Sequence, residues 1–269
     1  MPRRCVTKLS LCHCALTDSN ALEIGDMLTV NSVLTKLALD ENGIGDAGLT
    51  HIANALCQNT ALVKLSMNSN CVREAGVLAL GAACSRQCAL RSISLLENSL
   101  TPLAVSELAR AVAGNTVLAA LQLSWCVVSA HEVGALRHWH ATSQANSTLE
   151  SLSLLRTPLL PSQCLDRGSA LLDKHALTAL NLNHCSLQPP DMPYVARFLA
   201  DNAVLLTLDV SENNMLDAGA SELASALRQN TKLRTLALRD NDVTAPGLQS
   251  IFDAVPLPVL AIACPVLLC

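Results

Sequence analysis

The stretch LTKLALDENGIGDAGLTHIANALCQNTA, residues 34–61, contains the unit from which the chain is built. Leucines at 34, 37 and 39 are followed by asparagine at 42 and isoleucine at 44, which gives the pattern L-x-x-L-x-L-x-x-N-x-I. Apolar residues then recur three and four positions apart between Leu49 and Leu56, and Asn59 follows them. Leu62 begins the same pattern again. A leucine-rich pattern on a fixed period predicts a solenoid.

Nine such repeats follow one another along the chain. Their first residues are all aliphatic: Val6, Leu34, Leu62, Leu90, Leu118, Leu149, Leu177, Leu205 and Leu233. The starts recur with a 28-residue period, except that the step from Leu118 to Leu149 is slightly longer. We therefore assign residues 1–260 to a single domain of nine repeats. Residues 261–269 are an apolar tail, which we interpret either as a truncated tenth repeat of a longer protein or as a segment that docks on a partner.

Each repeat predicts a strand, a turn, a helix and a second turn. Leu9 and Leu11 alternate with Ser10, as in a strand with one buried face. Asparagine or cysteine recurs three residues after the strand, where a stacked side chain can satisfy buried loop backbone. Glycines such as Gly48 recur at the start of the helix, where they allow close approach of a neighbouring backbone. Asparagines such as Asn59 recur at the helix ends, where we expect left-handed backbone.

The different widths of strands and helices predict the curvature of the stack. Parallel strands lie ~4.8 Å apart, whereas helix axes need roughly 8 to 10 Å. The stack therefore has to bend with its strands on the inside. We expect an α/β fold, a right-handed α/β horseshoe with a concave parallel sheet and convex helices.

Composition excludes several classes of function. The net charge of -4 and the pI near 5.9 provide no basic field for nucleic acid. The apolar segment from Val255 is interrupted by prolines and is shorter than the ~20 residues of a membrane helix. The first residues, MPRRCVTKLS, contain no apolar signal segment, so we expect a cytoplasmic protein with mostly free thiols. We find no cofactor motif, and the cysteine spacings do not predict a metal site.

The period, the strand pattern and the helices resemble a known class of repeats. Helix segments such as THIANALCQN at 50–59 and SELASALRQN at 221–230 are similar to the ribonuclease-inhibitor-like class of leucine-rich repeats. This class includes ribonuclease inhibitor, the repeat arrays of NOD-like receptors, the Ran GTPase-activating protein and flagellar scaffold proteins. The resemblance implies a protein partner on the concave face. The G-x-x-x-x-G-K-[S/T] motif expected of NOD-like receptors and the acidic tail of the Ran activator are both absent from this sequence.

One apolar group on the expected concave face has the composition of a binding hot spot. Leu96, Trp125 and Leu155 come from three consecutive repeats, at positions that are polar in most others. Glu97 and Arg156 flank them. An exposed aromatic residue among aliphatic residues with a charged rim is typical of a protein-binding surface. The alternative is that Trp125 folds over the sheet edge and seals the irregular fifth repeat.

A second candidate surface is acidic. Asp209, Glu212 and Asp240 are predicted to lie together, with Arg239 among them. They can receive a basic segment of a partner, or they are ordinary solvated charges. Lys8, Lys36 and Lys64 recur at one position of three successive repeats and form a basic stripe. This stripe either meets an anion or consists of lysine stems that cover the sheet with solvated heads.

We interpret the chain as a non-catalytic module, or scaffold, that binds a protein partner on its concave face. No nucleophile, base and orienting group share a predicted neighbourhood, so we expect no enzyme activity. Two alternatives remain. The chain regulates an enzyme, for example by activating a GTPase, with Arg156 or Arg239 as the rim arginine; or it is a structural scaffold of a cilium or flagellum. The identity of the partner and the oligomeric state are left open.

Overall fold

The structure is a computed structural model that describes residues 6–86, 88–124, 148–157, 176–255 and 261–263. The chain divides into two compact units, Met1–Val127 and Val128–Cys269, which we call the N-terminal and the C-terminal unit. The boundary between them falls inside the fifth repeat, which is the longest of the nine.

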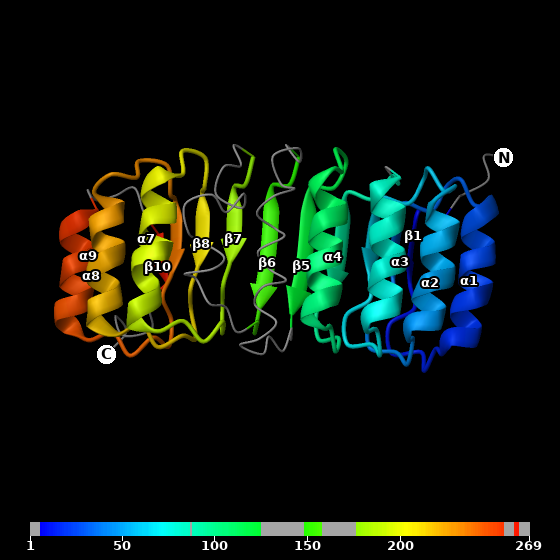
Figure 1. The fold of residues 1–269 in the computed structure, drawn as a ribbon, viewed down its shortest axis with the longest axis horizontal. Coiled ribbons are helices and arrows are strands. Elements are labelled where there is room, and N and C mark those ends of the chain that lie inside the picture. The colour runs from blue at the N-terminus through cyan, green and yellow to red at the C-terminus, as the bar shows by residue number, and fades with distance from the viewer. Residues whose placement is uncertain (1–5, 87, 125–147, 158–175, 256–260, 264–269) are drawn as a thin grey trace. The chain divides into compact units, whose positions relative to one another are not determined.

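The N-terminal unit alternates strands and helices (Figure 1). Its strands are β1 (Lys8–Ser10), β2 (Lys36–Ala38), β3 (Lys64–Ser66), β4 (Ser92–Leu95) and β5 (Ala120–Ser124). Its described helices are α1 (Asp18–Val30), α2 (Asp46–Leu56), α3 (Glu74–Ser85) and α4 (Pro102–Ala113). Each helix follows the strand of its own repeat, as the period predicts.

The C-terminal unit repeats the same order. Its strands are β6 (Ser151–Leu155), β7 (Ala179–Asn181), β8 (Thr207–Asp209), β9 (Thr235–Ala237) and β10 (Ala261–Ala263). Its described helices are α7 (Met192–Asp201), α8 (Leu216–Leu227) and α9 (Ala245–Ala254), and the short 3-10 helix η2 (Pro189–Asp191) precedes α7. Strand β10 lies in the apolar tail and pairs with β9, with Ile262 opposite Leu236.

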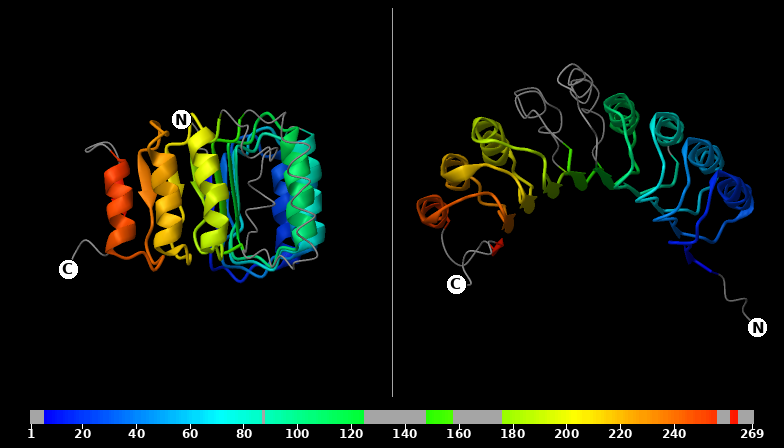
Figure 2. Two further views of the ribbon diagram at one scale, coloured as in Figure 1. Left: turned by 60° about the vertical axis from the view of Figure 1, so that its left-hand side comes forward. Right: turned by 90° about the horizontal axis from the view of Figure 1, so that it is seen from below.

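In each unit the strands form one layer and the helices the other (Figure 2). Neighbouring strands are parallel and in register at the repeat period, so that Leu37 lies opposite Leu9 and Leu65. The leucines of the pattern point into the space between the layers, where Leu37 and Leu39 are buried. Helical residues such as Ile52 and Leu56 pack against them from the other layer. The α/β horseshoe class predicted from the repeat is confirmed.

A ladder of asparagines closes the turn after strands β2, β3, β4, β8 and β9. The Asn98 side chain donates its Nδ2 hydrogens to the backbone oxygens of Met67, Leu95 and Leu96 at 2.8 to 3.2 Å. Its Oδ1 accepts from the backbone N–H of Val72 at 3.0 Å. The other described members each donate to a backbone oxygen 31 residues earlier: Asn42, Asn70, Asn213 and Asn241. Each of these asparagines thus joins its repeat to the one before it.

Cysteine replaces asparagine in the ladder at Cys185. Its thiol donates to the backbone oxygen of Leu154 at 3.0 Å, again 31 residues earlier. The prediction that cysteine fills the asparagine position is confirmed. A thiol is a weak donor with one hydrogen, so this repeat has fewer side-chain bonds across the turn than an asparagine would make.

A second asparagine ladder lies at the helix ends, and there the predicted backbone is wrong. Asn31 and Asn202 have φ of −83° and −82°, which is not left-handed. The side chains have a bonding role instead. Asn59 donates to the backbone oxygens of Leu28 and Asn31 at 2.7 and 2.8 Å and accepts from the N–H of Leu62 at 2.8 Å. These asparagines recur because their amides connect the end of one helix to the next repeat.

A carboxylate from one helix caps the helix of the following repeat. Asp18 Oδ1 accepts from the backbone N–H of Gly45 and Gly48 at 2.7 and 3.0 Å. Asp46 does the same for α3, and Asp217 for α9. A Cβ atom at Gly48 would lie 2.7 Å from Asp18 Oδ1, so only glycine leaves room for the carboxylate. The glycines at this position of α2, α3 and α9 therefore leave room for a cap that comes from another repeat.

We predict that Asn98→Ala lowers the free energy of unfolding by about 3 kcal/mol, because it leaves buried carbonyls and one N–H without a partner. Chemical denaturation monitored by circular dichroism measures the change. Asn98→Cys is the control and should lose roughly half as much, since Cys185 shows that a thiol can make one of these bonds. Equal losses for the two variants would contradict the ladder as the source of the stability.

Replacing the carboxylate cap tests the contact between repeats separately. Asp46→Ala should lower the free energy of unfolding by about 1 kcal/mol, the usual effect of losing an N-terminal cap. Asp46→Asn keeps an acceptor oxygen at the same place and should retain most of the stability. If the Asn variant lost as much as the Ala variant, charge and not hydrogen bonding to Arg73 and Gly76 would be the main contribution of Asp46.

Candidate protein-interaction surface

The corner row is the set of residues that immediately precede the turn asparagine or its substitute. Its described members share a left-handed backbone with φ between 50° and 56°: His13, Glu41, Ser69, Glu97, Arg156, His184, Glu212 and Asp240. Positive φ is uncommon for residues other than glycine. The sequence pattern predicted the row itself, but not this conformation.

The conformation of the corner row follows from the hydrogen bonds on either side of it. The N–H of Glu41 still bonds to the next repeat, donating to the backbone oxygen of Asn68 at 2.8 Å. One residue later the side chain of Asn42 has to enter the turn and reach Leu39 O and Leu11 O. A left-handed residue between the two makes this sharp change of direction. It also directs the corner side chain outward, where most of the row is exposed.

The residue before each corner forms the strand-end row. In the N-terminal unit this row is linked by polar contacts. Asp40 Oδ1 accepts from the Ser66 hydroxyl at 2.6 Å and from the backbone N–H of Asn68 at 2.7 Å. Asn68 Oδ1 accepts in the same way from Ser94 and from the N–H of Leu96, at 2.6 and 2.8 Å. These acceptors are therefore held in place by the sheet.

The predicted hot spot is only partly within the described residues. Leu96 is half-buried in the N-terminal unit, and Leu155 is half-buried in the C-terminal unit. Trp125 lies outside the described residues, so its grouping with these leucines stays a prediction. Glu97 is exposed in the corner row and accepts a hydrogen bond from Ser69 at 2.7 Å. Arg156 is an exposed corner residue of the C-terminal unit.

The structure brings most of the predicted acidic group together and shows how its charge is compensated. Arg239 lies 3.3 Å from Glu212 Oε1 and 2.9 Å from Asp240 Oδ2. The third carboxylate, Asp209, accepts from the backbone N–H of Ser211 at 2.9 Å. The group is thus a network with an internal arginine, in which each carboxylate already has a partner.

Two members of this network were not among the predicted site residues. His184 Nδ1 lies 3.3 Å from Glu212 Oε2, and Asn183 Nδ2 lies 3.4 Å from Glu212 Oε1. A carboxylate can only accept, so the imidazole nitrogen is the donor. His184 stands one repeat before Glu212 in the corner row, and the same spacing pairs His13 with Glu41 at 2.8 Å. A histidine and a glutamate separated by one repeat period are the sequence signal that identifies such pairs.

These contacts change the acidity of Glu212. The hydrogen bond from His184, then that from Asn183 and the charge of Arg239, hold the pKa of Glu212 below its ordinary value, against partial burial. All three favour the ionised carboxylate. Glu212 therefore stays charged at the centre of the network at pH values where an isolated glutamate begins to take up a proton.

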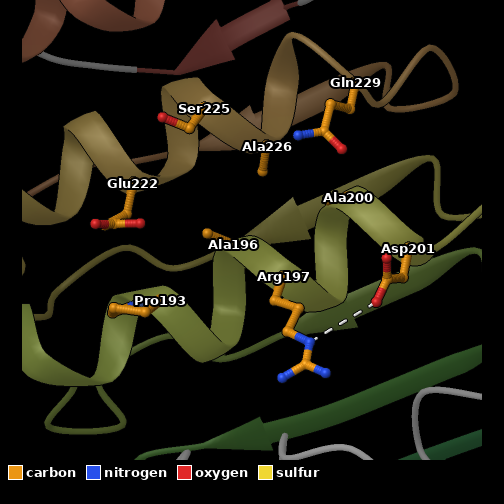
Figure 3. A pocket seen from close by; sticks show the side chains of 9 residues that line it. All are labelled: Pro193, Ala196, Arg197, Ala200, Asp201, Glu222, Ser225, Ala226 and Gln229. Atoms are coloured by element: carbon orange, nitrogen blue, oxygen red, sulfur yellow. Dashed lines mark ion pairs between the residues drawn. The ribbon is translucent and has the colours of Figure 1, made fainter.

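The helix layer contains a different kind of cavity. A groove of about 340 Å³ lies between α7 and α8, with the small side chains of Ala196 and Ala226 along it (Figure 3). Arg197 at its rim is 4.0 Å from Asp201. A similar groove of about 300 Å³ lies between α3 and α4 in the N-terminal unit. Because such a groove recurs between neighbouring helices with small side chains, we attribute it to helix packing and not to a ligand.

The described part of the chain contains no group of three or more histidine, cysteine or acidic side chains arranged to hold a metal ion. Among the same residues, no helix combines the length and the apolar character needed to cross a bilayer.

Comparison with known proteins identifies the repeats. The family model described as Leucine Rich repeat matches residues 30–53, 201–224 and 229–252. Ribonuclease inhibitor of Sus scrofa is 36% identical over 115 residues, which cover 40% of this chain and 24% of the relative. NACHT, LRR and PYD domains-containing protein 13 of Homo sapiens is 30% identical over 115 residues, 42% of this chain and 11% of the relative.

A third relative has a regulatory name. The Protein phosphatase 1 regulatory subunit 37 homolog of Caenorhabditis elegans is 25% identical over 150 residues, covering 54% of this chain and 16% of the relative. The chain thus spans about a quarter or less of the length of these curated relatives. The repeats indicate a protein-interaction module.

We predict that His184→Ala raises the pKa of Glu212, because it removes the largest of the causes that lower it. A folded-state pKa below the unfolded value stabilises the protein above the unfolded pKa, and this contribution is lost as the pH falls through the folded pKa. Acid unfolding of His184→Ala should therefore begin at a higher pH. Carbon-13 NMR titration of the Glu212 carboxyl measures the pKa directly.

Arg239→Ala is the matched control for this titration, since the arginine acts on Glu212 more weakly than the histidine does. It should raise the pKa of Glu212 by a smaller amount. An unchanged Glu212 pKa in His184→Ala would show that the His184 contact is not made in solution.

Proposed function

We propose, from the premise that this chain is a leucine-rich repeat protein of the ribonuclease-inhibitor-like class, that it binds a protein partner on the inner face of its sheet. The helices cover the other face of the strands in each unit, whereas most described corner residues are exposed and most described strand-end residues are half-buried. The proposed module is non-catalytic and needs no cofactor. Its location is the cytoplasm, which is consistent with the free thiols at all seven cysteines of the described residues.

The observation that carries this proposal is the composition of the corner row. A left-handed residue other than glycine costs ~1 kcal/mol or more relative to its right-handed form. Glycine would avoid that cost, yet none of the nine corner positions has glycine, while the chain uses glycine elsewhere. The fold requires the left-handed backbone conformation at each corner position, but it does not require a particular side chain there. A side chain kept at each of these positions at an energetic cost is the pattern expected of a surface used for recognition.

The proposed contact surface has two parts. The first is the apolar group of Trp125, Leu96 and Leu155, with Glu97 and Arg156 as its rim. Aromatic side chains surrounded by aliphatic and charged neighbours contribute most of the affinity at protein interfaces. The second part is the network of Asp209, Glu212, Arg239 and Asp240. Because its charges are partly compensated internally, we expect it to provide specificity more than affinity.

Enzyme regulation is a narrower form of the same proposal. The names ribonuclease inhibitor and protein phosphatase 1 regulatory subunit homolog refer to proteins that act on enzymes. A partner enzyme could be held in the same way by this chain. Arg239 is a poor candidate for a regulatory arginine that reaches a partner's active site, because it is already bonded to Glu212 and Asp240. Arg156 is the other arginine that the sequence suggests for this role.

We predict that Trp125→Ala weakens partner binding by about 2 kcal/mol or more without altering the fold. Affinity capture followed by mass spectrometry identifies the partner, and calorimetric titration then measures its affinity for each variant. Trp139→Ala is the matched control, because the sequence contains two tryptophans and the pattern predicts Trp139 on the helix side of the fifth repeat.

The outcome for the two tryptophans decides the location of the site. A loss of affinity in Trp125→Ala alone supports the inner face. If Trp125→Ala binds the partner as tightly as the unmodified chain does, with circular dichroism unchanged, the proposed hot spot at Trp125 is wrong.

A further inference from the structure

Three lysines form a straight row across the N-terminal unit. Lys8, Lys36 and Lys64 are the first residues of β1, β2 and β3, and the register places each directly opposite the next. All three are exposed. Adjacent strands lie ~4.8 Å apart, so three positive charges are attached within roughly 10 Å of each other. We call this set the lysine row.

The lysine row has no ion-pair partner among the described residues. No ion pair between described residues involves Lys8, Lys36 or Lys64, whereas the carboxylates of the same inner face have partners. Asp40 accepts from Ser66 and from the backbone of Asn68, and Glu41 pairs with His13. The positive charge is therefore available to a ligand.

Distance separates the row from those carboxylates. Lys36 is the first residue of β2, whereas Asp40 lies two residues beyond the end of this strand, so that four residues or ~13 Å of extended backbone separate them. The Debye length at physiological ionic strength is about 8 Å, so the acidic side chains at the strand ends do little to neutralise the lysines. The small side chains of Ser10, Ala38 and Ser66 occupy the positions between. The inner face of this unit thus has a basic edge, a shallow centre and an acidic edge.

Folding does not require lysine at these positions. The equivalent residues of the other repeats, which form the same strands, are uncharged: Ser92, Ala120, Ser151, Ala179, Thr207 and Thr235. Like charges directly opposite each other on neighbouring strands destabilise a sheet. Three lysines placed in register are thus unfavourable for the isolated fold, and an acidic ligand would relieve their repulsion. The alternative, that lysine stems merely cover the sheet, does not account for the register of the charges.

We propose that the lysine row docks a carboxylate-rich segment of a protein partner. This inference rests on the proposed function, since it gives the chemistry of the partner for one part of the inner face. A peptide in extended conformation presents every second side chain on one side at ~6.6 Å intervals, which flexible lysine heads can match. The net charge of -4 and the acidic strand ends oppose a long polyanion such as nucleic acid, which carries charge over a much larger width.

Fluorescence anisotropy with a fluorescein-labelled hexaglutamate peptide tests the proposal on the full chain. The combined variant Lys8→Ala, Lys36→Ala and Lys64→Ala should bind about tenfold more weakly, because each exposed ion pair contributes a factor of about two to three. The matched control removes three exposed positive charges elsewhere, with Arg73→Ala, Arg228→Ala and Lys232→Ala. It has the same net charge and should bind within about twofold of the unmodified chain.

Charge reversal gives a second readout that does not depend on a loss of binding. The variant Lys8→Glu, Lys36→Glu and Lys64→Glu should bind labelled hexalysine about tenfold more tightly than the unmodified chain does. Thermal unfolding of each variant confirms that the fold is retained, and the alanine variant should be at least as stable as the unmodified chain because the repulsion between lysines is removed.

Three results would overturn the proposal. These are equal hexaglutamate affinity for the lysine variant and its control, no gain of hexalysine binding on charge reversal, or tighter binding of a labelled thymidine hexanucleotide than of hexaglutamate. Failure here is distinguishable from failure of the proposed function. If partner capture depends on Trp125 but hexaglutamate does not bind, the proposed function is supported and the lysine-row proposal is wrong. If hexaglutamate binds but Trp125→Ala has no effect on partner capture, recognition takes place at the lysine row.

Discussion

The amide of the turn asparagine is the interaction on which the rest of the structure depends. An amide offers two N–H donors and an oxygen with two acceptor sites, so a single side chain can join backbone groups of two repeats. Asn98 uses both capacities, and burial makes each bond costly to lose. The side chain can reach these groups only if the chain turns abruptly one residue earlier. The left-handed corner at Glu97 is the consequence.

Many polar side chains of the described residues bond to a neighbouring repeat rather than to their own. The helix α3 receives its cap from Asp46 of the preceding helix, and Asn59 closes the end of α2 on the end of α1. One repeat alone would leave these groups unsatisfied, as expected of a unit that is stable only when stacked. The same period places corner side chains beside each other, which is why Glu41 meets His13.

The sequence was sufficient to predict the repeats, the parallel strands and the rows on the inner face, because a fixed repeat period leaves one register for the leucines. It was misleading where one residue type can have two structural roles. Asn31 suggested a left-handed helix end, but its backbone is not left-handed and its amide bonds to backbone instead. Left-handed φ occurs at Glu41 and Glu212, although glutamate is not a residue type that predicts this conformation. The bridging position of Arg239 between two carboxylates depends on its rotamer, which no pattern of residue types determines.

Two surfaces with the same backbone therefore differ in what they can recognise. In the C-terminal unit, Arg239 and His184 compensate Glu212 within the protein, so a ligand that binds there has to replace or extend bonds that already exist. In the N-terminal unit, Lys36 and its neighbours in register lie four residues before the strand-end row, and no described residue forms an ion pair with them. Under the proposed function, long-range attraction of an acidic ligand should act through the lysines, and short-range selection should act at the network. Since neither set of side chains is required by the ladder that holds the repeats together, each can change without loss of the fold.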